Sequence, residues 1–179
     1  ALQLAAAAKQ LVVGDPTSAD TEVGPLIRPS EVERVQQWVN EAIEEGAELL
    51  SGGKALSVST FECTVLYAPS VESKVSREEI FGPVVCIYPY DEIDDAIAQA
   101  NSLPYAFQAA LFSKDIDTAT YAYKKLDASA VMINDHTAFR VDWMPFAGLR
   151  QSGLGVGGIP YTLRDMQVEK MMVLNSSNI

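Results

Sequence analysis

The sequence contains few of the residues that build metal centres or bind anionic polymers. Its 179 residues include one histidine and two cysteines, and Cys63 and Cys86 lack the C-x-x-C or Cys/His spacing that holds a metal ion. The 13 lysines and arginines stand against 24 acidic residues, giving a net charge of -11. Such a charge repels a phosphate backbone or an anionic membrane. We therefore expect no metal, no nucleic acid and no membrane as partners.

Long apolar runs are also missing. No unbroken stretch is long enough to cross a bilayer, and the opening residues, 1–4, have no basic region of a secretory signal. With so few cysteines, a reducing compartment is the default. These features predict a cytoplasmic protein, and the start in mid-pattern without Met predicts a portion of a longer chain.

A regular alternation of strand and helix patterns begins at residue 84. Apolar runs at 84–90, 107–112 and 130–134 predict strands, and helical patterns opening at Asp91 and Asp115 lie between them. Near-continuous apolar strands separated by helices are typical of a parallel sheet. We predict an α/β fold with a mostly parallel sheet and helices on both faces.

The first half adds shorter elements. A capping box, Ser30 to Glu33, predicts the start of an amphipathic helix that ends at Gly46. Short strands are expected at 47–50 and 64–67. These elements precede the longer strand–helix alternation and place residues 78–83 directly before the first long strand.

A long irregular segment, residues 135–160, follows the last of these strands. Loops of this length are usually functional or disordered, and open α/β sheets bind ligands beyond the carboxyl ends of their strands. A short helix near 161–166 and a last strand, 168–174, complete the pattern. We therefore look for ligand-binding residues between 135 and 160.

Two groups of residues in the chain favour structural interpretations. The glycine cluster 153–158 lacks the apolar strand that precedes a dinucleotide-binding loop, so we interpret it as a loop that needs positive φ angles. Cys86 lies in an apolar run and Cys63 has Glu62 beside it, which opposes thiolate formation. Both cysteines are expected to be structural thiols.

Three residues of the long loop leave alternatives open. His136 is either an acid–base group or substrate contact, or a solvated loop histidine. Arg140 is suited to bind a carboxylate, sulfonate or phosphate, and equally to form an internal salt bridge with Asp142 or Asp135. Phe146 either lines a pocket or belongs to the core.

Residues 78–90 combine polar and aromatic groups with a strand more tightly than any other stretch. Glu79, Phe81 and a Gly-Pro turn run directly into an apolar strand. In a buried sheet such a turn presents a carboxylate and a ring at the edge of the core, where both can meet a ligand. The alternatives are a solvated acidic turn for Glu79 and core packing for Phe81. Spacing alone does not identify a ligand.

Several motifs together resemble those of the aldehyde dehydrogenase superfamily. Residues 78–84 are similar to its E-E-x-F-G-P-V motif, and residues 13–16 with 24–27 are similar to its G-D-P and G-P-L-I segments. Further matches follow in the family's order: N-S-L-P-Y at 101–105, L-F-S-K-D at 111–115, and P-F-A-G with S-G at 145–153. The resemblance implies an incomplete aldehyde dehydrogenase catalytic domain, with residues 1–166 as its carboxyl-terminal part. Residues 167–179 would be a terminal strand and tail that contribute to homo-oligomer contacts.

The resemblance also implies a reaction, in which NAD or NADP serves the oxidation of an aldehyde to a carboxylic acid through a covalent cysteine intermediate. Glu79 would bind the nicotinamide ribose hydroxyls and Phe81 would press on the nicotinamide. His136, Arg140 and Phe146 would bind the aldehyde. The nucleophilic cysteine would precede Ala1, so this chain would hold no catalytic residue and would be inactive alone.

The run R-V-D-x-M-P-F at 140–146 resembles that of members acting on small, often anionic aldehydes. The sequence departs from the family pattern at two places. Residues 145–150 read P-F-A-G-L-R where the family has P-F-G-G-x-K, and residues 105–107 read Y-A-F where the family has Y-G-L.

The alternative to an enzyme fragment is a non-catalytic interaction module that uses the terminal strand, or a nucleotide-binding homologue without turnover.

Overall fold

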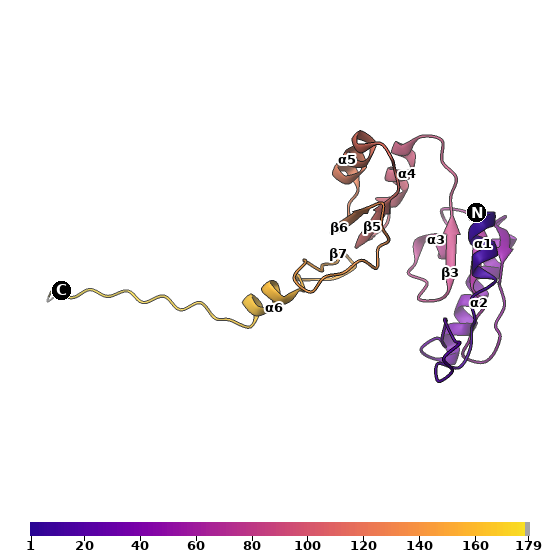
Figure 1. Ribbon diagram of the computed structural model, residues 1–179, viewed down its shortest axis with the longest axis horizontal. Coiled ribbons are helices and arrows are strands. Elements are labelled where there is room, and N and C mark those ends of the chain that lie inside the picture. The colour runs from indigo at the N-terminus through magenta and orange to yellow at the C-terminus, as the bar shows by residue number, and fades with distance from the viewer. Residues whose placement is uncertain (178–179) are drawn as a thin grey trace. The chain divides into compact units, whose positions relative to one another are not determined.

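A computed structural model describes residues 1–177 (Figure 1). The chain forms two compact units, Ala1–Tyr90 and Asp91–Ile179. Helices alternate with strands, and two of the strand pairs are parallel, so the predicted α/β class is confirmed. Among the described residues, no helix has both the length and the apolar character needed to cross a membrane.

The amino-terminal unit places its helices against one small sheet. Its elements are α1 (Leu2–Ala8), α2 (Pro29–Glu44), β1 (Glu48–Ser51), β2 (Thr64–Tyr67), α3 (Lys74–Arg77) and β3 (Val84–Ile87). The sheet order is β1-β2-β3, with β2 antiparallel to β1 and parallel to β3. The pairing of Thr64 with Val84 sets the parallel register. The two predicted short strands and the first long strand are therefore present.

Helix α2 supplies most of the core of this unit. Four of its side chains at helical spacing are buried: Val32, Val35, Val39 and Ala42. They pack in one cluster with Phe61 and Leu66, both of which are 0% exposed. A buried phenylalanine or leucine is worth about 1.5–3 kcal/mol relative to an exposed one. This cluster fixes the helix on the strands.

The start of α2 differs from the predicted capping box. The helix begins at Pro29, and Arg28 is its N-cap without a side-chain capping bond. Proline is favoured at the first helical position because its missing N–H would have no partner there. Ser30 therefore lies inside the first turn, too late to cap it. The carboxylate of Glu31 instead accepts hydrogen bonds from Nε of Arg28 at 2.9 Å and Nε of Arg34 at 2.6 Å.

The carboxyl-terminal unit contains two separate strand pairs. Its elements are α4 (Ile93–Ala100), β4 (Tyr105–Ala106), β5 (Gln108–Leu111), α5 (Ile116–Lys125), β6 (Ala130–Ile133), β7 (Leu149–Arg150) and α6 (Ile159–Asp165). Strands β5 and β6 are parallel, and β4 pairs antiparallel with β7. Asp115 caps α5, as predicted, by accepting the N–H of Thr118 at 2.8 Å. Helix α4 differs, since its N-cap is Glu92 and no side chain caps it.

Each unit contains one parallel pair among the expected strands. Strand β3 pairs with β2, whereas β5 and β6 form a two-stranded sheet of their own. An apolar run identifies a strand but does not specify which strand lies beside it. The expected parallel sheet is therefore present as separate parallel pieces.

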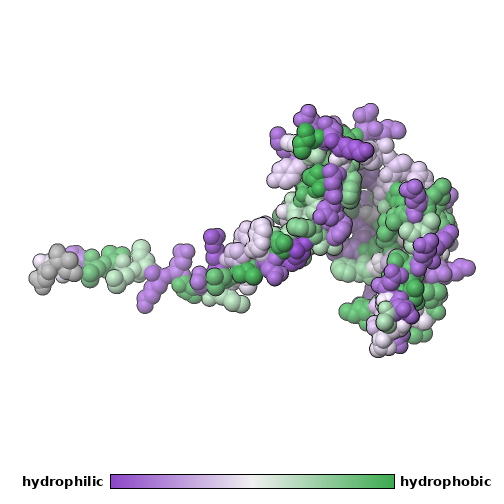
Figure 2. All heavy atoms as spheres, in the orientation of Figure 1, coloured by the Kyte–Doolittle hydropathy of each residue, from purple (hydrophilic) through white to green (hydrophobic). Residues whose placement is uncertain are grey.

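The predicted last strand, 168–174, forms no ladder with the described residues. Residues 167–176 carry neither helix nor strand, and the extended segment after α6 leaves apolar side chains open to solvent (Figure 2). Val168 is 93% exposed and Met171 is 85% exposed. A strand forms only where a second strand satisfies its backbone groups, and no described segment of this chain does so here.

Candidate functional site

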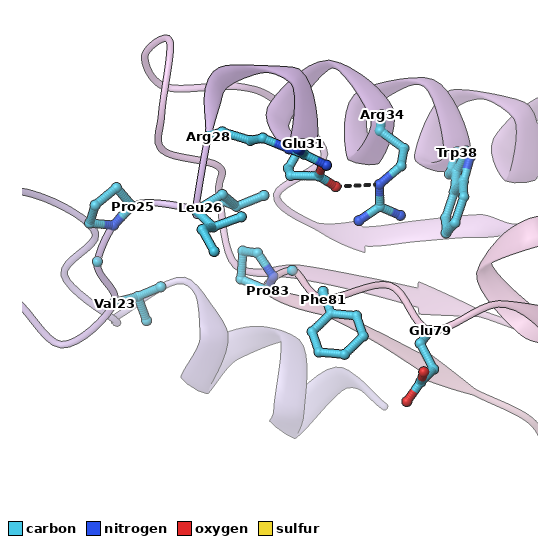
Figure 3. Close-up of a pocket in the computed structure, with 13 residues that line it drawn as sticks. Val23, Pro25, Leu26, Arg28, Glu31, Arg34, Trp38, Glu79, Phe81 and Pro83 are labelled. Atoms are coloured by element: carbon cyan, nitrogen blue, oxygen red, sulfur yellow. Dashed lines mark hydrogen bonds and ion pairs between the residues drawn. The ribbon is translucent and has the colours of Figure 1, made fainter. Parts of the chain in front are cut away.

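A hollow of about 840 Å³ in the amino-terminal unit brings the turn at residues 79–83 opposite helix α2 (Figure 3). Residues 23–28 form another part of its wall. Glu31, Arg34 and Trp38 project from α2 on one side, and Phe81 and Glu79 lie on the other. The two residues predicted to contact a cofactor therefore share one pocket.

The turn that carries Glu79 and Phe81 is fixed by its backbone and by the residue between them. Ile80 packs against the buried cluster beneath α2, and its carbonyl accepts a hydrogen bond from Nη2 of Arg34 at 2.5 Å. The Pro83 carbonyl accepts the N–H of Thr64 on β2 at 2.8 Å. Because the turn is attached to both the helix and the sheet, its outward side chains have a defined direction.

Phe81 is held in an unusual way for an apolar residue. Its side chain is 79% exposed and its φ is +46°, in the left-handed region that few non-glycine residues adopt. A Cβ added at the neighbouring Gly82 would lie 3.0 Å from Cγ2 of Val35. A side chain at 82 would thus press on Val35 where the turn approaches α2, and the ring of Phe81 faces the hollow (Figure 3).

Glu79 is exposed at the rim of the same hollow. No hydrogen bond or ion pair joins its carboxylate to another residue in the part of the chain that the structure describes. A carboxylate of this kind can accept hydrogen bonds from two neighbouring hydroxyl groups of a ligand. Together with an open aromatic face, it suits a ligand that is partly sugar and partly planar ring.

Three side chains of this pocket, Glu31, Arg34 and Trp38, were not anticipated from the sequence. They recur at spacings of three and four residues, which places them on one face of α2. The guanidinium carbon of Arg34 lies 4.3 Å from the centre of the Trp38 ring. The pKa of Glu31 is lowered chiefly by the hydrogen bond from Arg34 and to a smaller extent by that from Arg28. The helical spacing was the available signal for this group.

The predicted substrate residues lie in the other unit. The guanidinium carbon of Arg140 is 4.1 Å from the centre of the Phe146 ring, and Phe146 meets the ring of Phe107 edge-on at 4.8 Å. No acidic residue among those described forms an ion pair with Arg140, so the alternative of a salt bridge to Asp142 or Asp135 is not realised. The guanidinium therefore stacks on a ring while its donors stay open to an anion.

His136 has a local environment of its own. The ring Nδ1 of His136 accepts a hydrogen bond from the backbone N–H of Ala138 at 3.1 Å. The backbone N–H of His136 donates to Oδ1 of Asp135 at 2.8 Å. Its Nε2 lies 3.8 Å from the same Asp135 oxygen. With Nδ1 accepting, the proton of the neutral ring is on Nε2. His136 is exposed, and its contacts are with its immediate neighbours rather than with Arg140 or Phe146.

The glycine-rich segment forms a hairpin that begins at Phe146. Phe146 and Gly157 exchange two backbone hydrogen bonds, of 3.1 and 2.8 Å. Gly155 and Gly158 have φ of +76° and +109°, and a Cβ at Gly158 would lie 2.4 Å from the Met144 carbonyl oxygen. The interpretation of the cluster as a loop that needs positive φ is confirmed at these two positions.

Both cysteines have environments that oppose thiolate formation. Burial raises the pKa of Cys86, whose Sγ lies 3.7 Å from the Val75 carbonyl oxygen. Burial also raises the pKa of Cys63, and the nearby charge that adds to it belongs to Glu22 rather than to Glu62 as predicted. Neither thiol has the cationic setting of a reactive nucleophile.

Comparison with known proteins gives one consistent result. The family model described as "Aldehyde dehydrogenase family" matches residues 2–172. The chain is 42% identical over 167 residues to 3-sulfolactaldehyde dehydrogenase from Priestia aryabhattai, covering 93% of this chain and 35% of that protein. The chain thus spans about a third of the length of the curated relatives it matches.

Solved structures agree with the sequence relatives. Aldehyde dehydrogenase 21 from Physcomitrella patens, in complex with the reaction product succinate, has a TM-score of 0.86 at 38% identity, covering 90% of this chain and 34% of that one. Glyceraldehyde-3-phosphate dehydrogenase from Methanocaldococcus jannaschii, complexed with NADP, has a TM-score of 0.86 at 37% identity, covering 92% of this chain and 35% of that one. The amino-acid sequence and the backbone therefore both match aldehyde dehydrogenases.

Proposed function

The chain belongs to the aldehyde dehydrogenase family, and on that premise we propose that it is part of an NAD(P)-dependent enzyme that oxidises a small anionic aldehyde to a carboxylic acid. The proposal that the substrate is anionic rests on the Arg140 guanidinium, which stacks on Phe146 without an acidic partner among the described residues. Relatives named for sulfolactaldehyde and for aspartate semialdehyde support the same class.

The hollow between α2 and the 79–83 turn fits the nicotinamide ribose part of NAD(P). Ribose offers hydroxyl donors, and Glu79 is a carboxylate with open acceptor sites. A nicotinamide ring needs an apolar surface to pack on, and the ring of Phe81 is 79% exposed beside that carboxylate. Solved relatives contain NADP or NAD+. The residues present therefore suit the cofactor that the family uses.

The proposed roles of this chain are binding and orientation. When bound, NAD(P) accepts the hydride that leaves the aldehyde. Glu79 would hold the ribose and Phe81 would limit the positions open to the ring, since Arg34 and Ile80 fix the turn that carries both. Such preorganisation places reacting groups without further loss of entropy at the moment of reaction.

Arg140 would hold the end of the aldehyde that is remote from its carbonyl group. A guanidinium presents planar donors that match a carboxylate, sulfonate or phosphate, and contact with the Phe146 ring limits its freedom. His136, with its Nε2 proton and its exposed position, would contribute a further polar contact in the same loop. This arrangement selects for charge at the end of the substrate remote from its carbonyl.

The charge selectivity can be tested by Arg140→Ala in the complete enzyme. Loss of a charge-assisted contact is expected to lower kcat/KM for an anionic aldehyde by roughly 10- to 100-fold, and to leave a neutral aldehyde of similar size little changed. Arg164→Ala, at an exposed arginine of α6, is the matched control. Equal losses with both aldehydes would rule out a role in charge recognition.

The chain alone is predicted to be inactive. A family nucleophile must be a thiolate, and burial raises the pKa of both thiols in this sequence. Incubating the purified chain with an aldehyde and NAD+ or NADP+ and recording absorbance at the wavelength of the reduced cofactor tests this. Steady cofactor reduction that is lost in a Cys63→Ala, Cys86→Ala double variant would contradict the prediction.

The segment after α6 is proposed to contribute to subunit association. Its apolar side chains are exposed, with Met172 at 83% and Val173 at 80%. An extended segment with unpaired backbone groups can add to the edge of a sheet in another chain. Residues 167–179 would then form an oligomer contact, separate from the part of the catalytic domain in residues 1–166.

A further inference from the structure

Arg150 occupies the centre of a hydrogen-bonded junction in the carboxyl-terminal unit. It lies in β7, has a φ of +55°, and departs from the lysine that the family motif usually carries. Its Nη1 donates to the carbonyl oxygens of Asn101 at 2.8 Å and Leu103 at 2.5 Å. Its Nη2 pairs with the carboxylate of Asp127. One guanidinium therefore satisfies acceptors from two different segments.

The acceptors of Arg150 lie where two helices end. Asn101 is the residue that closes α4, and its side-chain amide donates to the carbonyl of Lys125, the last residue of α5, at 2.8 Å. The side-chain oxygen of Asn101 accepts the N–H of Asp127 at 2.9 Å. Helix carboxyl ends carry partial negative charge. The positive charge of Arg150 therefore lies near the partly negative carboxyl ends of both helices, which stabilise it.

The same backbone stretch carries Phe146. From the Phe146 to Gly157 bridge, the chain reaches β7 within a few residues, and β7 pairs with β4 through Tyr105 and Ala106. Two hydroxyl groups also hold this stretch: Ser129 donates to the Ala147 carbonyl at 2.5 Å, and Ser152 accepts the N–H of Ala106 at 2.9 Å. Arg150 is its charged attachment point.

Phe146 in turn supports Arg140. Among the described residues, the Arg140 guanidinium contacts the Phe146 ring, with its carbon 4.1 Å from the ring centre. A shift of the hairpin would therefore move the surface on which that guanidinium rests. Errors of about 1 Å in a binding group can cost up to roughly 100-fold in rate.

We propose that Arg150 is a positioning residue: by holding the 146–157 hairpin on the ends of α4 and α5, it places Phe146 and Arg140 for binding an anionic aldehyde. The proposal rests on the function proposed above for Arg140. An arginine serves this purpose better than a lysine because its planar donors reach the two carbonyls and the carboxylate together.

The anchoring can be tested on this chain without any activity assay. Arg150→Ala is expected to raise amide hydrogen exchange within residues 146–157 by roughly tenfold or more, since the hairpin loses a charged attachment. Arg150→Lys should give an intermediate rate, and Arg164→Ala should match the unaltered chain. Unchanged exchange in Arg150→Ala would overturn the proposal, whatever the reaction of the complete enzyme.

The consequence for substrate binding is tested in the complete enzyme. Arg150→Ala should raise KM for an anionic aldehyde by roughly tenfold, with little change in kcat and little change in KM for a neutral aldehyde, and Arg150→Lys should recover part of the loss. In an Arg140→Ala background, Arg150→Ala should then cause no further loss of selectivity. Equal effects on both aldehydes, or additive losses in the double variant, would show that Arg150 does not act through Arg140. If the enzyme oxidises only neutral aldehydes, the proposed function fails while the exchange result still decides the anchoring.

Discussion

The amino-terminal and carboxyl-terminal units hold their candidate site residues by different means. In the first unit, the turn with Glu79 and Phe81 rests on a cluster that includes Phe61 and Leu66, both fully buried. In the second unit, the most buried apolar residues are small or scattered: Ile97, Ala106, Ala119, Ala122 and Met132. The loop with Arg140 and Phe146 depends mainly on hydrogen bonds to single carbonyls and on the contacts of the Phe146 ring with Arg140 and Phe107.

The difference bears on how rigidly each unit holds its own candidate residues. A group tied to a continuous core moves only when the core opens, whereas a loop held by separate polar contacts can open locally at a lower free energy. The proposed cofactor contacts, Glu79 and Phe81, are therefore expected to be fixed in advance. The proposed aldehyde contacts, Arg140 and Phe146, are expected to adjust more readily.

The largest effect is expected from emptying the core of the first unit. Phe61→Ala should lower the free energy of unfolding by about 3–5 kcal/mol, because it removes a fully buried ring and leaves a cavity. Phe112→Ala in the second unit, where the ring is 71% exposed, should change it by less than about 0.5 kcal/mol. Urea denaturation followed by circular dichroism measures both. Similar losses in the two variants would break the contrast between the units.

An intermediate effect is expected from Arg34→Ala. The change removes the hydrogen bond to the Ile80 carbonyl, the pair with Glu31 and the stacking on Trp38, for a loss of about 1–3 kcal/mol. Faster amide exchange at residues 79–84 would locate the loss at the turn. The control is Arg77→Ala, an exposed arginine paired with exposed Glu72. If exchange at the turn stays slow in Arg34→Ala, the core alone holds the turn.

The smallest effect is expected from acid. In the first unit, hydrogen bonds from Thr17 lower the pKa of Asp15. The pKa of Glu31 is lowered chiefly by Arg34, and that of Glu41 chiefly by Lys74. In the second unit, hydrogen bonds from Thr118 lower the pKa of Asp115. A lowered folded-state pKa gives stability that is present above the unfolded pKa and is lost as pH falls through the folded value.

The first unit, with three such carboxylates, should therefore lose more stability than the second as pH falls below about 4.5. Trp38 reports on the first unit and Trp143 on the second, so variants that keep one tryptophan follow each unit separately. Denaturation curves from pH 6 to pH 3 are the measurement. A steeper loss in the unit with Trp143 would reverse the expected order.

The sequence was sufficient for elements whose signals are local. The Asp115 cap on α5 needs only its own first turn, and the buried face of α2 follows from apolar residues at helical spacing. The start of α2 was misplaced because Pro29 at the first helical position overrides the Ser30 to Glu33 box. Sheet partners were not predictable, since β3 pairs with β2 through a register that no local pattern encodes.

The candidate site divides in the same way. Glu79 and Phe81 could be singled out from their motif, and the structure places both at one hollow. Arg34 and Trp38 could have been added from helical spacing alone. The sequence could not decide whether Arg140 pairs with Asp135 or Asp142, because that depends on the path of a long loop. The contacts of Arg150 likewise join residues more than 20 positions apart.

The backbone at Phe81 shows how stability and ligand binding oppose each other at one residue. A left-handed φ of +46° costs a side-chain-bearing residue about 1–2 kcal/mol, and glycine would adopt it without that cost. The exposed ring also contributes little burial in return. A chain selected for stability alone would carry glycine at position 81, so a screen for thermal resistance should favour Phe81→Gly and discard the ring that the cofactor would need.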